Sequence, residues 1–142
     1  ELGNYEAALS DINQAIKLDS KDSEAFRLRA QIACRLQRWS QAQQDLAKLA
    51  RLGTGSTFIQ AQIAFGLSEY QRAIQLFSEC IELSKVVPHN VFTPIVNPEV
   101  YLLRGQVYEQ LGRTDQALSD YCHYLLWLPN APEAPSLLAR MG

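Results

Sequence analysis

Four alanines recur in the same local context, and this recurrence constrains the fold more than any other feature of the sequence. They are Ala8, Ala42, Ala73 and Ala117, at intervals of 34, 31 and 44 residues. A large apolar residue follows each alanine by four positions: Ile12, Leu46, Phe77 and Tyr121. Because a methyl group leaves room for a neighbouring backbone, the alanines mark places where two helices approach closely. Spacing of this kind indicates an internal repeat of helix pairs.

Apolar residues follow the three-and-four spacing of amphipathic helices along nearly the whole chain. The predicted helices are residues 5–18, 26–36, 39–52, 58–67, 69–83, 98–111 and 114–128, with the start of another in 132–142. Ser23 is the expected cap of the second helix, and Gly53 is the expected left-handed stop of the third. Asn97 and Pro98 have the pattern of a cap followed by a pre-set first helical residue.

We expect these helices to pair into a single all-α array of about three and a half repeats. The predicted units are residues 1–22 (the second helix of a truncated repeat), 23–53, 54–97 with an insertion at 84–97, 98–131, and 132–142 as the start of a further helix. The chain begins in mid-repeat and without a methionine, so we expect it to be a fragment of a longer protein.

Composition argues against several classes of partner. With 142 residues, 47% of them hydrophobic, the chain can bury the core of one domain. Its net charge of −2 provides no strong basic field for nucleic acid or an anionic membrane. No apolar run approaches the length of a membrane span, and no secretory signal opens the chain. Cys34, Cys80 and Cys122 are scattered and odd in number. We therefore expect buried thiols in an intracellular, cytoplasmic location.

At these positions the sequence resembles the tetratricopeptide-repeat family, whose unit is a helix–turn–helix of about 34 residues. The fullest match, within residues 98–131, comprises Tyr101, Gly105, Tyr108, Leu111, Gly112, Ala117, Tyr121 and Pro129. The earlier units match at Gly3, Tyr5, Ala8 and Ala15, then at Phe26, Ala30, Trp39, Ala42 and Leu46, and then at Ala61, Ala64, Tyr70, Ala73 and Phe77. The resemblance implies an α-solenoid of stacked antiparallel helix pairs.

The resemblance also implies a binding groove, because the first helices of successive repeats in this family line a concave surface that holds a peptide or a partner helix. The positions at which we expect contact with a partner are Arg27, Gln31, Arg35, Phe58, Gln62, Phe65, Leu102 and Gln106, beside Glu24, Ile59, Glu99 and Glu109. Three of them, Gln31, Gln62 and Gln106, are equivalent in the repeat. They form either a ladder of amides that binds an extended backbone or a solvated helix face.

Members of the family that bind chaperone tails hold the terminal carboxylate with a lysine, an asparagine and further basic residues. The aligned positions of this chain contain one cation, Arg27, and Glu99 would repel a carboxylate. We therefore do not expect a carboxylate clamp. A groove of apolar residues and amides suits an amphipathic segment better.

The sequence offers little chemistry for catalysis. His123 adjoins Cys122, but neighbours on a helix point about 100° apart and do not form a nucleophile–base pair. Asp11, Asp45 and Asp120 recur at equivalent positions of second helices, where we expect them to face outward into solvent. No metal-binding spacing occurs. We therefore predict no enzyme, no catalytic residues, no cofactor and no metal.

The insertion at residues 84–97 is too long for a turn of such a repeat and too apolar for a solvated loop. It could extend the preceding helix as far as Val87 and fold back over a neighbouring helix, which we favour because this buries apolar side chains. Alternatively, Phe92 and Ile95 project as an anchor for another protein.

The predicted function is a non-catalytic protein–protein interaction module, a scaffold that binds a peptide or helix of a partner in its groove. The alternatives are a structural subunit that packs through its convex face or the insertion, and a regulatory domain of a larger enzyme. The sequence identifies neither the partner, the pathway nor the oligomeric state.

Overall fold

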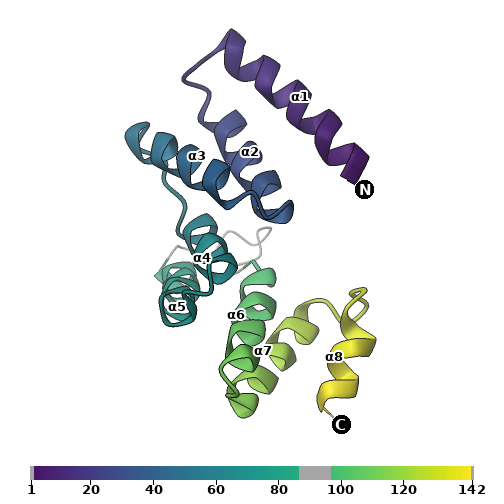
Figure 1. Cartoon of the computed structure of the whole chain (residues 1–142). Coiled ribbons are helices and arrows are strands. Elements are labelled where there is room, and N and C mark those ends of the chain that lie inside the picture. Colours follow the sequence, from purple (N-terminus) through teal and green to yellow (C-terminus); the bar gives the residue numbers. More distant parts are fainter. Residues whose placement is uncertain (1, 87–96, 142) are drawn as a thin grey trace. The chain divides into compact units, whose positions relative to one another are not determined.

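The computed structural model of the chain describes residues 2–86 and 97–141, and every regular element in these ranges is an α-helix (Figure 1). The helices are α1 (Leu2–Leu18), α2 (Ser23–Arg35), α3 (Trp39–Arg51), α4 (Thr57–Gly66), α5 (Tyr70–Val86), α6 (Glu99–Gln110), α7 (Thr114–Trp127) and α8 (Ala134–Met141). The prediction of an all-α fold is confirmed.

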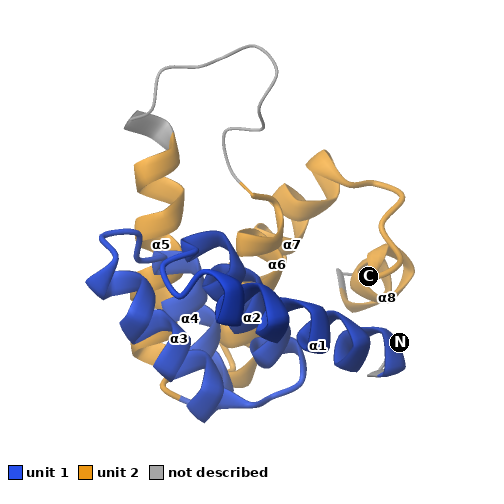
Figure 2. Ribbon diagram, turned by 90° about the horizontal axis from the view of Figure 1, so that it is seen from above, with its two compact units in different colours: residues 1–68 blue, residues 69–142 orange. Residues whose placement is uncertain are grey.

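The helices form two compact units, residues 1–68 and residues 69–142 (Figure 2). Unit 1 contains α1 to α4, and unit 2 contains α5 to α8. The most extensive helix–helix contacts join α2 to α3 in unit 1 and α6 to α7 in unit 2, so two of the three predicted helix pairs are present. The boundary between the units falls inside the predicted third repeat, and the repeat boundaries stay a prediction.

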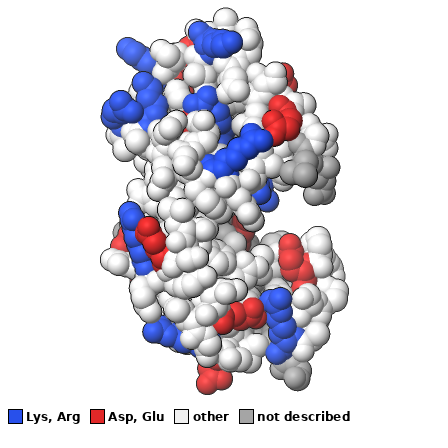
Figure 3. All heavy atoms as spheres, in the orientation of Figure 1, with Lys and Arg blue, Asp and Glu red and all other residues white. Residues whose placement is uncertain are grey.

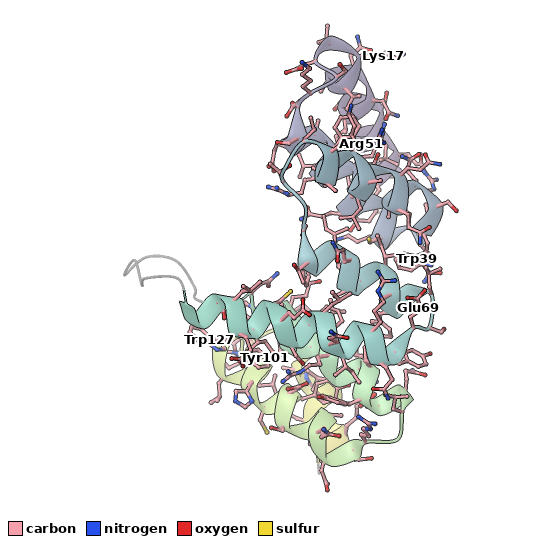
Figure 4. The ribbon with its side chains drawn as sticks, turned by 90° about the vertical axis from the view of Figure 1, so that its left-hand side faces the viewer. Lys17, Trp39, Arg51, Glu69, Tyr101 and Trp127 are labelled. Carbon is pink, nitrogen blue, oxygen red and sulfur yellow. The ribbon has the colours of Figure 1, made fainter. Side chains whose placement is uncertain are left out.

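The core of unit 1 forms where α2 crosses α3 and α4. Its buried residues are Phe26, Ala30, Ala33, Cys34, Ala42, Leu49, Ile59 and Ile63. Trp39, at the start of α3, packs against this core from one side (Figure 4). A methyl group on Gly66, the last residue of α4, would overlap the indole of Trp39. The missing side chain at Gly66 therefore makes room for the tryptophan.

The core of unit 2 is built on larger side chains. Its buried residues are Leu102, Tyr108, Ala117, Tyr121, Tyr124 and Leu137. A methyl group on Gly105 would lie 2.6 Å from Cε1 of Tyr121, so α6 and α7 approach closely only because that glycine has no side chain.

Three of the four recurrent alanines are buried, as the repeat predicts. Ala117 is 1% exposed, and Ala42 and Ala73 are fully buried. Ala8, by contrast, is only half-buried.

The first helices of the hairpins end on left-handed residues. Gln37, Ser68 and Gly112 follow α2, α4 and α6 with φ angles of 59°, 62° and 73°. Each lies five positions before one of the recurrent alanines, so the same turn geometry recurs with different residues. Gly53, after α3, has a φ of 77°, which confirms the predicted left-handed stop.

Side-chain caps explain where α2 and α4 begin. Oδ1 of Asp22 accepts hydrogen bonds from the backbone N–H groups of Glu24 and Ala25. The prediction that Ser23 caps α2 is therefore wrong, because Ser23 is already the first helical residue. Oδ1 of Asn97 accepts from the N–H of Glu99 at 3.1 Å, but the cap residue of α6 is Pro98, and the helix begins at Glu99. The prediction of Asn97 as the cap and Pro98 as the first helical residue is therefore off by one position. Oγ of Ser56 accepts from the N–H of Ile59 and caps α4.

Helix α5 continues to Val86, within one residue of the predicted extension into the insertion. The predicted fold-back and the predicted contacts of Phe92 and Ile95 lie outside the described residues.

Candidate functional site

In unit 1 the predicted groove residues belong to two helices that pack against each other, α2 and α4. Arg27, Gln31 and Arg35 are spaced by four residues along α2, which puts them on one face of the helix. The corresponding residues of α4 are Phe58, Gln62 and Phe65. On the face of the molecule drawn in Figure 3, lysines and arginines gather on the part formed by unit 1.

Arg27 is held in place by two contacts on this face. Its Nη2 donates to the carbonyl oxygen of Thr54, just before α4, and its Nη1 forms a salt bridge of 3.3 Å with Glu24. The side chain remains 35% exposed, so the guanidinium is both oriented and accessible. An oriented arginine loses less conformational entropy when it binds a partner than a freely rotating one does.

Gln62 is the most distinctive of the predicted groove residues. Its side chain is half-buried, and its Oε1 is enclosed without a hydrogen-bond donor among the described residues. Buried side-chain oxygens are nearly always paired in native proteins. Phe58 and Phe65, one turn to either side on α4, are half-buried, whereas Ile59 is fully buried in the core and offers no contact surface.

In unit 2 the predicted groove residues lie on α6 and are less accessible. Leu102 is 8% exposed and packs in the core of the unit, so it is not available to a partner. Gln106 is half-buried. Both carboxylate oxygens of Glu109 lie 3.3 Å from Nη1 of Arg140 on α8, which ties the last helix to α6. The proposed ladder of Gln31, Gln62 and Gln106 stays a prediction.

Two aspartates that we expected in solvent are buried. Asp45 on α3 is 1% exposed, and it accepts two hydrogen bonds from Arg29 on α2, from Nε at 2.9 Å and from Nη2 at 2.7 Å. Nη1 of the same arginine donates to Asn13 on α1, and the guanidinium lies 5.3 Å from the ring centroid of Phe26. Arg29 thus joins three helices. Its two hydrogen bonds and its positive charge compensate the burial of the Asp45 carboxylate.

Unit 2 contains the same arrangement. Arg104 on α6 donates from Nε and Nη2 to Asp120 on α7 at 2.8 and 2.7 Å, and from Nη1 to Ser78 on α5 at 3.1 Å. It also lies over the rings of Tyr101 and Tyr108. Burial lowers the pKa of Arg104, but the hydrogen bonds and charge of Asp120 outweigh this and leave it raised. Asp120 is 3% exposed, so the outward-facing prediction is wrong here too.

The sequence contains a signal for these buried arginine–aspartate pairs that our interpretation missed. An arginine lies thirteen positions before Ala42 and before Ala117, and an aspartate lies three positions after each, so both pairs are separated by 16 residues. The third unit, centred on Ala73, has Gln60 and Leu76 at these positions and lacks the pair. Asp11, three positions after Ala8, is exposed and is the one aspartate of the three that fits the prediction.

The cysteines and the described histidine form no reactive pair. The imidazole of His123 stacks on Tyr101, with ring centroids 4.9 Å apart, and its Nδ1 donates to the carbonyl oxygen of Ser119. Cys34 is buried, and burial raises the pKa of its thiol to about 11 although Arg35 lowers it. Cys122 is exposed, which corrects the prediction that all three cysteines are buried.

Comparison with known proteins places this arrangement in a family. Two family models, each described as tetratricopeptide repeat, match residues 1–57 and residues 98–130, together well over half of the chain. The chain belongs to the tetratricopeptide-repeat family. A crystal structure of MamA resembles this tetratricopeptide-repeat chain with a TM-score of 0.61 and 22% identity, over 89% of this chain and 70% of that chain. At this identity the likeness concerns the fold, an α-solenoid. A search of curated proteins gave no match.

Tetratricopeptide repeats are in general protein-interaction or scaffold modules, and this is the general role of the chain. Within residues 2–86 and 97–141, no helix is both long and apolar enough to cross a membrane. In the same ranges no three histidine, cysteine, aspartate or glutamate side chains come together as a possible metal site.

Proposed function

We propose that this tetratricopeptide-repeat chain is a non-catalytic module that binds an amphipathic segment of a partner protein on the face of unit 1 formed by α2 and α4. The observation that supports this most directly is Gln62, whose enclosed amide oxygen has no donor among the described residues. Because the oxygen is enclosed, a bound segment would supply that donor after the half-buried side chain turns its amide toward the surface. The residues around it on α4, Phe58 and Phe65, offer apolar surface for the other side of the segment.

The charge of this face narrows the kind of segment. Arg27 and Arg35 lie on the same side of α2, and the side chain of Arg27 remains 35% exposed beside its salt bridge to Glu24. A segment with apolar side chains on one side and a carboxylate or a polar backbone group toward α2 therefore complements the face. Gln106 of unit 2 stays a separate predicted contact, and the predicted contacts of Phe92 and Ile95 lie outside the described residues. A cytoplasmic location remains part of the proposal.

A displayed library of random peptides, selected on the chain, provides a defined probe. Selected peptides should lose about tenfold or more in affinity when Gln62 or Arg27 is changed to alanine. Each change leaves a polar group of the bound peptide without its hydrogen bond in the interface. Gln44→Ala on α3 is the matched control, since Gln44 is an exposed amide on a second helix. Circular dichroism should show the same helical content in all three variants.

The alternative of a structural subunit makes the opposite prediction. Selected peptides that lose affinity with Gln44→Ala, and keep it with Gln62→Ala and Arg27→Ala, would show that binding uses second helices. That result would overturn the proposed groove while leaving a protein-interaction role in place.

A further inference from the structure

Two leucines at the end of α7 occupy repeat positions that hold no large apolar residue in any other unit. Leu126 lies nine positions after its recurrent alanine, and Leu128 lies eleven positions after it. They are 81% and 42% exposed, and Trp127 between them is 50% exposed (Figure 4). These three consecutive residues form the apolar end of α7. The residues of the other units that are equivalent to the two leucines are Lys17, Arg51 and Glu82, and Asp19, Gly53 and Ser84.

The exposure of this repeat position does not depend on which helices come next along the chain. Arg51 and Glu82, which are equivalent to Leu126, are both exposed although helices of the next repeat follow each of them. Leu83, which is equivalent to Trp127, is exposed in the same way. The position therefore faces solvent in the repeat itself, and α7 places apolar side chains where the other second helices place hydrophilic ones. Exposed apolar clusters of this kind mark interaction sites.

Two carboxylates lie beside the apolar end of α7. Oε2 of Glu133, an exposed residue, accepts a hydrogen bond of 3.0 Å from the hydroxyl of Tyr124, one turn before Trp127. Burial raises the pKa of Tyr124 to about 12, and Glu133 and then Glu99 of α6 add to this rise. Of the residues in the last turn of α7, none is basic, whereas α1 and α3 each have basic residues there. The helix itself therefore does not balance the partial negative charge of its C-terminus.

Three arginines of unit 2 are held away from this end. Arg104 is bound to Asp120. Arg140 is bound to Glu109 in the last turn of α6, and Arg113 lies in the turn between α6 and α7. The 14 residues of α7 separate that turn from the apolar end by about 20 Å.

We infer that the apolar end of α7 binds a basic amphipathic helix of a partner protein. Apolar side chains of this helix cover Leu126 and Leu128, and a lysine or arginine lies over the indole of Trp127 and pairs with the carboxylate of Glu133. Charge complementarity identifies this partner, because apolar surface beside carboxylates and a helix C-terminus favours a cation with apolar neighbours. The same carboxylates would repel an anionic membrane surface.

This surface is distinct from the α2–α4 face of the proposed function. It lies on unit 2 and is acidic, whereas the α2–α4 face lies on unit 1 and carries Arg27 and Arg35. Either surface can therefore fail its test while the other passes.

Two peptides of opposite charge provide the probe. The first is a helical peptide of about 14 residues, with leucines spaced by three and four positions and lysines elsewhere, and the second has glutamates in place of the lysines. Titration of the whole chain with the lysine peptide, followed by amide chemical shifts, should perturb residues 122–133. The glutamate peptide should bind about tenfold or more weakly, because it meets carboxylates instead of complementing them.

The repeat itself supplies the variant that tests the apolar contact. Leu126→Glu with Leu128→Ser copies Glu82 and Ser84 of the third unit. It should weaken binding of the lysine peptide about tenfold or more, although it adds a negative charge, because the apolar contact is lost. Both positions are exposed, so circular dichroism should show unchanged helical content.

Two further variants separate charge from general stickiness. Glu133→Gln, whose amide oxygen can still accept from Tyr124, should weaken binding of the lysine peptide about threefold. Leu18→Ser is the matched control, since Leu18 is the exposed residue of α1 that is equivalent to Trp127, and it should leave the affinity unchanged.

Several outcomes would overturn the inference. Equal affinity for the two peptides, or shift changes confined to other helices, would show that the apolar end of α7 is not a site for a basic helix. Other occupants would be identified by effects of the double variant Leu126→Glu with Leu128→Ser. If it abolished binding to vesicles of phosphatidylcholine and phosphatidylserine, the occupant would be a membrane, and if it abolished self-association, the occupant would be a second copy. Higher peptide affinity in the variant Phe92→Ser with Ile95→Ser would show that the insertion of the chain itself competes for the site.

Discussion

Arg104 on α6 and Asp120 on α7 form two parallel hydrogen bonds of 2.8 and 2.7 Å, and the carboxylate they hold is almost completely buried. Arg29 and Asp45 repeat this geometry in unit 1. Each arginine also binds a side chain of the preceding second helix, Ser78 in one case and Asn13 in the other. One guanidinium thereby fixes three helices, so these two residues determine how each hairpin stacks on its neighbour.

The first prediction concerns this pair. Asp120→Ala should lower the free energy of unfolding by about 3 kcal/mol, because it leaves the Arg104 guanidinium in a largely buried position without its counter-charge. The double variant Arg104→Gln with Asp120→Leu, which copies Gln60 and Leu76 of the third unit, should lie within about 1 kcal/mol of the wild type. Chemical denaturation of the single and double variants measures both.

An exposed ion pair serves as the control for that experiment. Arg72 and Glu69 lie 3.1 Å apart, with side chains 64% and 43% exposed. Glu69→Ala should change the unfolding free energy by no more than about 0.5 kcal/mol, since water screens the pair. If Asp120→Ala lowered the unfolding free energy no more than Glu69→Ala does, the Arg104–Asp120 pair would not determine how the hairpin stacks on its neighbour.

The second prediction concerns the left-handed turns. Gln37 and Ser68 adopt φ angles of 59° and 62°. In this left-handed region the backbone of a residue with a Cβ atom is strained, whereas that of glycine is not. Gln37→Gly and Ser68→Gly should each raise the free energy of unfolding by about 1 kcal/mol, and with it the melting temperature. Gly112→Ala, at the equivalent turn with φ of 73°, should have the opposite effect. A shift of the melting temperature in the same direction in all three variants would contradict the assigned backbone conformation.

The third prediction concerns the close approach of α6 and α7. Gly105→Ala should destabilise the chain by about 1–3 kcal/mol, because the new methyl group would meet the buried ring of Tyr121, which has little room to move. Gly3→Ala on α1 is the matched control, since nothing lies within 4 Å of its added methyl group and alanine favours a helix. Thermal unfolding followed by circular dichroism should separate the two variants, and a stabilising Gly105→Ala would show that α6 and α7 are not so close.

The fourth prediction concerns thiol reactivity and pH. Iodoacetamide at pH 8 should modify Cys122 well before Cys34, because Cys122 is exposed while burial raises the pKa of Cys34 to about 11. The folded state therefore keeps a proton on Cys34 that the unfolded state, with a thiol pKa near 9, releases first. The contribution of this thiol to stability is complete below pH 9 and is lost as the pH rises toward 11. Peptide mass spectrometry measures the order of modification, and faster labelling of Cys34 would contradict its burial.

A matched variant isolates the pH effect. Cys34→Ala removes the titrating group, so its unfolding free energy should fall less steeply between pH 9 and pH 11 than that of the wild type. Parallel slopes for the two proteins would show that Cys34 does not titrate in this range.

The sequence by itself determined the helical class, the helix pairs α2–α3 and α6–α7, and the burial of Ala42, Ala73 and Ala117. Apolar periodicity, glycine and proline act locally, and a small residue at a fixed interval marks a close crossing whatever the partner. The burial of Asp45 and Asp120 was recognised only in the tertiary structure, because it depends on Arg29 and Arg104 of adjacent helices, although the 16-residue spacing of each pair is present in the sequence. Asp11, Asp45 and Asp120 occupy equivalent positions, yet the two that meet an arginine of an adjacent helix are buried and Asp11 is exposed. Periodicity records which residues share a helix face, whereas the environment of that face depends on the helix that packs against it.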